Sequence, residues 1–186
     1  MRTTPLRRFG HEQATVATTP YLLFAVHGVA YAVPLLGVRE VMDLVRLAPV
    51  DEAPEALLGT QVLRGHRIPV VDLGAVLEQR RLRLTRTSAT MVVQSAVVRG
   101  DSAADETLIG LAVDGVRGVI GLAASDLAPS PRLGETAVMD VVSAMASTAQ
   151  GLVPVLDLAR ILASTDARQA VAAWHAAEAG AAQPVA

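Results

Sequence analysis

Short runs of apolar residues, each bounded by turn-forming residues, follow one another along most of the chain. Tyr21–Val26 and Val29–Val33 are two such runs, and only His27-Gly28 separates them, which is typical of a β-hairpin. Comparable runs predict further strands at 59–63, 67–71, 90–98, 108–113, 138–145 and 152–156. Outside the C-terminal tail, no segment has the period of a long amphipathic helix. We therefore expect a mainly β protein.

One of these segments occurs twice. The stretch 65–77 returns 85 positions later, and the second copy places Asp157 where the first has Asp72. A weaker match, at an offset of 78, relates residues 37–41 to residues 115–119. Duplication of a strand and a short helix predicts two similar halves, each a small barrel or sandwich, that pack around a shared core.

Asp72 and Asp157 each stand between a predicted strand and a predicted short helix. At such a junction a carboxylate accepts hydrogen bonds from the free amides of the first helical turn, which stabilises the helix by about 1 kcal/mol. Alternatively, the two carboxylates could serve as the general acid and base of a β-barrel enzyme. Capping alone explains an Asp at both places, so we favour capping and keep the enzyme as the alternative.

The two ends of the chain differ from its middle. Residues 1–19 are polar and aperiodic, so we expect a flexible arm there and ordered structure from Tyr21. Residues 165–186 are rich in alanine, and helix propensity predicts a helix over 167–179. The intervening residues 20–164 are predicted to form one domain of two intertwined subdomains.

The composition narrows the range of functions. Apolar residues make up 52% of the chain but aromatic residues only 3%, so the core must consist of aliphatic side chains. The chain has no cysteine, and all 16 basic residues are arginine, which excludes thiol and lysine chemistry. A net charge of -2 does not indicate nucleic acid or a membrane surface as a partner. No signal peptide is apparent and no stretch reaches the ~18 apolar residues of a membrane span, so we expect a cytoplasmic protein.

No pattern in the sequence indicates a metal, a cofactor or a nucleophile. None of the four histidines is paired with another histidine three or four residues away; they are His11, His27, His66 and His175. Neither a Gly-x-Ser-x-Gly elbow nor a Gly-rich phosphate loop occurs. The arginines between 80 and 86 indicate a solvated linker or, alternatively, a docking patch for an acidic partner.

Arg64 is a stronger candidate for function. It stands beside Gly65 in a predicted tight turn that projects its side chain outward. A guanidinium held on a rigid turn can anchor an interface by bonding carboxylates and carbonyls with its planar fork. The second copy has Thr148-Ala149-Gln150 at the matching place, without an arginine. This turn is therefore the part of the repeat that can carry function, and the alternative is a surface arginine without a task.

The run from Leu57 to Leu73 resembles the signature of CheW-like chemotaxis coupling domains. In that family an apolar-x-Gly-Val-x-Asn-Leu-Arg-Gly segment leads into Ile-Pro-Val-x-Asp-Leu. Four further segments resemble family motifs, in the family's order: Tyr31-Ala32-Val33-Pro34, Val38-Arg39-Glu40-Val41, Gly110–Val116 and Leu152–Leu162. The resemblance spans Tyr21 to Ser164.

The resemblance implies two five-stranded SH3-like β-barrels that share a hydrophobic core. It also implies an adaptor, monomeric by itself, without enzymatic activity or cofactor. Such adaptors bridge chemoreceptor tips and the regulatory domain of a CheA-type histidine kinase within membrane-associated receptor arrays. On the family pattern, Leu63, Arg64 and Gly65 bind the kinase, and Val38 and Glu40 lie near the groove that holds the receptor hairpin.

The chain departs from the family pattern beside the predicted turn. Val62 replaces the usual Asn, and Thr60-Gln61 replaces Val-Ile or Val-Thr. These departures leave open whether the partners belong to a flagellar system or to a pilus-type, twitching-motility system. Two further classes remain beside the adaptor, an enzyme that uses Asp72 and Asp157 and a sensor for a small apolar molecule. The lack of convergent polar groups argues against the sensor.

Overall fold

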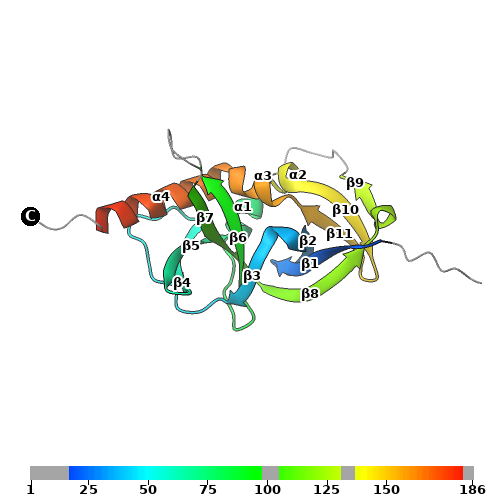
Figure 1. The fold of residues 1–186 in the computed structure, drawn as a ribbon, viewed down its shortest axis with the longest axis horizontal. Coiled ribbons are helices and arrows are strands. Elements are labelled where there is room, and N and C mark those ends of the chain that lie inside the picture. Colours follow the sequence, from blue (N-terminus) through cyan, green and yellow to red (C-terminus); the bar gives the residue numbers. More distant parts are fainter. Residues whose placement is uncertain (1–16, 98–104, 131–136, 182–186) are drawn as a thin grey trace, which may run out of the picture.

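The computed structural model describes residues 17–97, 105–130 and 137–181. Two β-sheets lie beside each other along the long axis of the molecule, and helices cover one side of both (Figure 1). The predicted mainly β architecture is confirmed.

Each sheet is a curved strip whose strand order does not follow the sequence. The five-stranded sheet has the order β3-β6-β7-β5-β4, with β3 (Val38–Asp43), β6 (Ala89–Val97), β7 (Asp105–Val113), β5 (His66–Asp72) and β4 (Leu57–Leu63). The six-stranded sheet has the order β8-β1-β2-β11-β10-β9, with β8 (Gly115–Leu122), β1 (Thr19–Val26), β2 (Val29–Pro34), β11 (Gly151–Leu156), β10 (Val142–Thr148) and β9 (Leu127–Pro129). We call them barrel 1 and barrel 2. The sixth strand of barrel 2 is the three-residue β9.

The strand order of barrel 1 matches that of barrel 2 when each strand is replaced by its counterpart from the other half of the chain. Hairpin β1-β2 is followed by β3, but β3 pairs with β6 in barrel 1. Hairpin β6-β7 is followed by β8, which pairs with β1 in barrel 2. The predicted match at an offset of 78 falls on β3 and β8, the two exchanged strands. Each barrel therefore contains strands from both halves of the chain.

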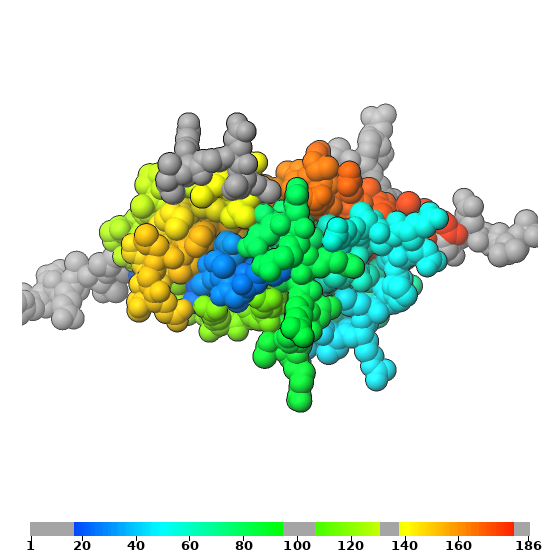
Figure 2. Space-filling view, turned by 180° about the vertical axis from the view of Figure 1, so that it is seen from behind, coloured from blue at the N-terminus to red at the C-terminus, as the bar shows by residue number. Residues whose placement is uncertain are grey.

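The long-range repeat also has its counterpart in the sheets. β5 pairs in parallel with β7 through Val70 and Gly110, and β11 pairs in parallel with β2 through Val155 and Ala32. From behind, the blue N-terminal strands lie against the gold C-terminal ones (Figure 2). Two barrels that were merely linked end to end would lack such long connections between paired strands. Here these connections fix the two halves of the chain to each other.

Three apolar clusters fill the part of the molecule that the structure describes. The largest joins both sheets to the helices and includes Phe24 and Val33 from barrel 2 with Met91 and Leu111 from barrel 1. A second cluster lies within barrel 2 and is built around Tyr21, Leu23, Ala32, Leu122, Ala146, Val153 and Val155. The third lies within barrel 1 and consists of Leu63, Ile68 and Val92, with Met42 and Leu108 packed against them. The predicted common core is confirmed, and it consists almost entirely of aliphatic side chains.

The helices are short except for the last. They are η1 (Leu35–Gly37), α1 (Leu73–Glu78), η2 (Ala124–Asp126), α2 (Ala137–Val141), α3 (Leu158–Ala163) and α4 (Thr165–Ala181). The predicted C-terminal helix is confirmed as α4, and its buried Ala167, Ala170 and Val171 join the shared core. The predicted arm at 1–19 lies largely outside the described residues, and β1 begins at Thr19, two residues earlier than expected.

One predicted strand was wrong. The segment 138–145 was expected to be a strand, but its first part forms helix α2 and only Val142 onward joins β10. The reason is burial on one side: Val138 and Val141, three residues apart, both pack against the shared core. That spacing suits one helical face, and a short apolar run does not distinguish this from a strand.

Candidate partner-binding surface

The turn between β4 and β5 presents Arg64 to solvent. Leu63 and His66 face each other across the hairpin, so Arg64 and Gly65 form a two-residue loop. Their φ angles are +50° and +86°, as a type I′ turn requires, and this turn matches the twist of the strands. The Arg64 side chain is 80% exposed.

The three residues predicted to bind a kinase have different surroundings. Leu63 is buried inside barrel 1, where it contacts the cluster of Ile68 and Val92. Gly65 supplies a backbone conformation that residues with a side chain rarely adopt. Only Arg64 extends its functional group outward, so Leu63 and Gly65 hold the turn that carries it.

Arg64 contacts one of the residues predicted for the receptor groove. Its Nη2 donates to Glu40 Oε2 at 2.9 Å, and Glu40 lies in β3 at the opposite edge of the sheet. Because the pair is mostly exposed, it contributes only about 0–1 kcal/mol to stability. Its importance is geometric, since it joins two predicted sites that lie 24 residues apart in the sequence.

Strand β3 alternates between a half-buried and an exposed face. Val38, Glu40 and Met42 are half-buried, whereas Arg39, Val41 and Asp43 are exposed. Val38 packs against the shared core, behind the surface. Val38 and Glu40, both predicted to lie near the receptor groove, are thus half-buried on the same strand, but only Glu40 reaches the surface, where it pairs with Arg64.

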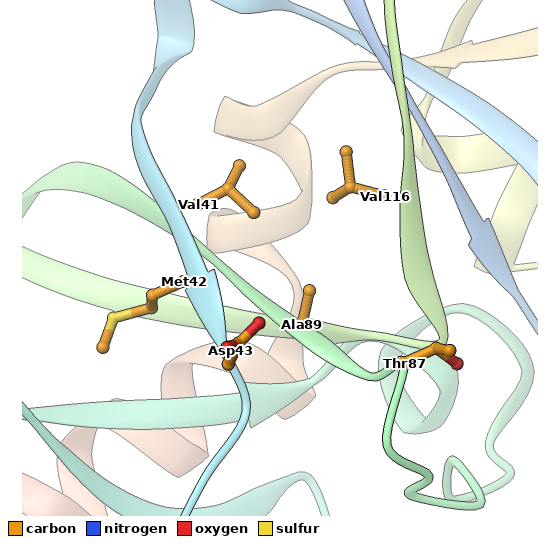
Figure 3. A pocket seen from close by; sticks show the side chains of 6 residues that line it. All are labelled: Val41, Met42, Asp43, Thr87, Ala89 and Val116. Carbon is orange, nitrogen blue, oxygen red and sulfur yellow. The ribbon is translucent and has the colours of Figure 1, made fainter.

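A groove lies between β3 and β8, the two exchanged strands (Figure 3). Its volume is about 420 Å³ and its lining residues are Val41, Met42, Asp43, Thr87, Ala89 and Val116. Val41 from β3 and Val116 from β8 extend into the space between the strands (Figure 3). Neither Val41 nor Val116 was among the predicted site residues. The match at an offset of 78 relates Val116 to Val38 and Val41 to Val119, so it marks the two strands without pairing the two groove residues.

The family model for the CheW-like domain matches residues 20–166. The chain belongs to the CheW-like family. A chemotaxis protein CheW of Klebsiella aerogenes is 20% identical over 146 residues, which is 78% of this CheW-like chain and 82% of the relative. A chemotaxis protein CheW of Rhizobium meliloti is 27% identical over 110 residues, 59% of this chain and 65% of that protein.

Among solved structures, the scaffolding protein TtCheW from Thermoanaerobacter tengcongensis has a similar fold. The TM-score is 0.66 at 22% identity, and the match covers 81% of this CheW-like chain and 96% of that structure. The two-barrel SH3-like architecture expected from the resemblance is thereby confirmed. Among the helices of the described residues, none combines the length and the apolar character needed to cross a membrane.

The two aspartates of the repeat cap helices in this CheW-like chain. Asp72 Oδ1 accepts from the amides of Gly74 and Ala75 at 2.9 and 3.2 Å. Its Oδ2 accepts from the amide of Leu82 at 3.0 Å, beyond the end of α1. Burial raises the pKa of the Asp72 carboxyl above its ordinary value, although the three amides and the charge of Arg81 act in the opposite direction.

Asp157 repeats the arrangement at the surface. Its Oδ1 accepts from the amides of Ala159 and Arg160 at 2.9 and 3.2 Å, and its Oδ2 lies 3.5 Å from Arg160 Nε. The predicted caps are therefore confirmed at both positions. With each carboxylate committed to its own helix, and with an adaptor family identified, the alternative of an enzyme that uses Asp72 and Asp157 is excluded.

The arginines near residue 80 are partly engaged within the chain. Arg80 pairs with Glu78 at 3.2 Å, and its carbonyl lies 2.9 Å from His27 Nε2. His27 begins the β1-β2 turn, with φ +49°, so this contact ties the segment after α1 to barrel 2. The contact favours a structural linker, and a docking patch here stays a prediction.

Proposed function

We propose that this CheW-like adaptor binds a chemoreceptor tip and the regulatory domain of a CheA-type histidine kinase on two adjoining surfaces of barrel 1. The observation that carries the proposal is the pair between Arg64 and Glu40. It joins the β4-β5 turn, our candidate kinase contact, to β3, which forms one wall of the groove. An adaptor needs two partners held in a fixed relation, and adjoining surfaces on one small barrel provide that relation.

The groove suits the apolar face of a helix from a receptor hairpin. Its opposing walls carry Val41 and Val116, and Val41 is 42% exposed in the free protein. Helices dock into such grooves through apolar residues spaced three and four apart. Glu40 would sit at the edge of this contact, and Val38 would support the strand from the core side.

The turn suits a kinase contact because its arginine is exposed on a rigid support. Leu63 fixes the strand end in the interior of barrel 1, and the type I′ turn directs Arg64 outward. An arginine in this setting can bond a carboxylate or a pair of carbonyls bidentately with little loss of side-chain freedom. The pair with Glu40 is weak enough to exchange for a partner group.

The test is co-sedimentation of the full chain with a receptor fragment and a CheA-type kinase. We expect Arg64→Ala to lose kinase binding and activation but to keep receptor binding. Val41→Asp should do the reverse, because it brings a charge into an apolar contact. Val41 is a better choice than Val38, whose replacement by Asp would also damage the shared core.

The matched control is Arg168→Ala, which removes an exposed arginine of α4 that does not line the groove and is not part of the β4-β5 turn. It should bind both partners as the wild type does. If Arg64→Ala and Val41→Asp both bind and activate normally, the two surfaces are wrongly assigned. If the wild type binds neither partner, the adaptor function itself is wrong for these partners.

A further inference from the structure

A polar pair is buried inside barrel 1. The side chains of Gln61 in β4 and Thr90 in β6 are both buried. The Thr90 hydroxyl donates to Gln61 Oε1 at 2.9 Å, and Gln61 Nε2 donates to the carbonyl of Asp43 in β3 at 2.7 Å. One side chain thus connects three strands. Buried polar groups of this kind are costly when unpaired, so the pairing strongly favours one arrangement of the strands.

The strands that Gln61 joins are the two edges of the sheet. β3 and β4 are the first and last strands of barrel 1, and they do not pair with each other in the sheet. Beyond the end of β3, a single bridge links Ala48 to Thr60. We call the approach of β3 to β4 the seam. Two side-chain contacts cross it: Gln61 to the Asp43 carbonyl, and Arg64 to Glu40.

Barrel 2 treats the matching edge differently. The residue that corresponds to Gln61 is Ala146 in β10, which is buried and apolar. There β10 pairs with β9 at Ala144, Met145 and Ala146, so backbone hydrogen bonds hold the edge. In barrel 1 the single bridge from Ala48 is the counterpart of β9. At the seam of barrel 1, side-chain hydrogen bonds therefore hold the edge that backbone hydrogen bonds hold in barrel 2.

From this arrangement we infer that Gln61 is a positioning residue that links the groove to the β4-β5 turn. The inference rests on the proposed function. Gln61 fixes the end of β3 that carries Met42 and Asp43, two lining residues of the groove, to β4, the strand that leads into the Arg64 turn. A helix that enters the groove and shifts β3 therefore also shifts β4 and the Arg64 turn. By linkage, each partner then changes the affinity of the other by the same factor.

Two substitutions at Gln61 distinguish the role of its hydrogen-bond donor, Nε2, from the role of its acceptor, Oε1. Gln61→Leu removes both contacts and leaves the Thr90 hydroxyl and the Asp43 carbonyl without this partner. Gln61→Glu is nearly the same size and still accepts from Thr90, but its carboxylate faces the Asp43 carbonyl and repels it. Because a buried carboxyl has a raised pKa, mild acid should protonate this Glu and let it donate to Asp43 again. Thr90→Val is the control that leaves the contact to β3 intact.

The decisive experiment measures kinase affinity with and without a saturating receptor fragment. For the wild type we expect the receptor to change the kinase Kd by at least about fivefold. Gln61→Leu and Gln61→Glu should reduce this factor to nearly one, with binding of each partner alone largely kept. Thr90→Val should retain the wild-type factor. A wild-type factor in Gln61→Leu, or a loss in Thr90→Val as great as in Gln61→Leu, would overturn the inference.

A second measurement needs no partner. Amide hydrogen exchange of β3 in the full chain should rise severalfold in both Gln61 variants, relative to β8 in the same molecule. For Gln61→Glu, the excess over the wild type should disappear in mild acid. If the chain binds neither partner but amide exchange of β3 rises in the Gln61 variants, the proposed function is wrong, and the role of Gln61 in holding the seam is supported. If both partners bind while exchange and coupling are unchanged, the seam fails and the proposed function stands.

Discussion

The two copies of the repeat share a frame and differ in what surrounds it. In both, a two-residue hairpin leads into a strand that ends at a helix-capping aspartate. The first copy is enclosed: Asp72 is buried, and its turn carries an arginine that pairs with another strand. The second copy is open: Asp157 is partly exposed, and its turn consists of Ala149 and Gln150. The two copies thus share one fold, but only the turn of the first copy carries a candidate partner contact.

The largest expected effects come from removing the two helix caps, one at a time. Asp72→Ala removes the acceptor for three amides and leaves them buried, whereas Asp157→Ala removes the acceptor for two amides that water can reach. We expect losses in the free energy of unfolding of about 3 and about 1 kcal/mol respectively. Urea denaturation of the purified variants measures both. Equal losses would mean that burial does not distinguish the two caps.

The next prediction compares glycine substitutions in the two turns. Relative to alanine, glycine should raise the stability at Arg64 and lower it at Ala149. Arg64 has φ +50°, so Arg64→Gly should be more stable than Arg64→Ala by about 1 kcal/mol. Ala149 is not among the positive-φ residues, so there Ala149→Gly should be less stable than the wild type by about 0.5–1 kcal/mol. Thermal melts of the three variants provide the test.

At the first turn, kinase binding should not depend on the stability of the variant. We expect Arg64→Gly and Arg64→Ala to lose kinase binding to the same extent, because both lack the guanidinium. An Arg64→Gly variant that binds the kinase normally would show that the turn, and not its side chain, makes the contact.

The pH dependence of stability sharpens the contrast at Asp72. Its pKa is raised in the folded protein above the ordinary value of 3.8, so the folded state holds the proton more tightly than the unfolded state. This contribution to stability is complete below pH 3.8 and is lost as pH rises through the folded pKa. A tenfold difference in proton affinity between the two states corresponds to about 1.4 kcal/mol. The stability of the wild type relative to Asp72→Asn should therefore fall across that window. A difference that rises with pH would mean that the amide bonds outweigh burial.

Local patterns predicted the features that depend on neighbouring residues. The hairpin at His27-Gly28 and the caps at Asp72 and Asp157 follow from turn and capping chemistry within a few residues. The repeat predicted two halves with a shared core because matching apolar runs need matching partners. Helix α2 was missed because five residues show too little of a period to separate helix from strand.

The candidate surface depended on contacts that sequence spacing does not reveal. The groove of Val41 and Val116 exists because β3 and β8 exchange barrels, and nothing near either strand specifies that exchange. Likewise, Gln61 meets Thr90 only after β4 and β6 have folded into one sheet. The match at an offset of 78 was the one signal that related the two groove walls, although it did not show that they face each other.

The smallest expected effect concerns which partner the first turn selects. Val62 is 62% exposed in β4 and lies across from Arg67, where the family usually has Asn. Because the side chain is at the surface, Val62→Asn should change the free energy of unfolding by no more than about 0.5 kcal/mol. Its effect should instead appear as a changed ratio of affinities for kinases from flagellar and pilus-type systems, measured side by side with Arg64 intact. The matched control is Ser147→Asn at the corresponding position of β10, which should leave that ratio unchanged. If neither substitution alters the ratio, partner choice lies outside this hairpin, and Val62 is only an exposed strand residue.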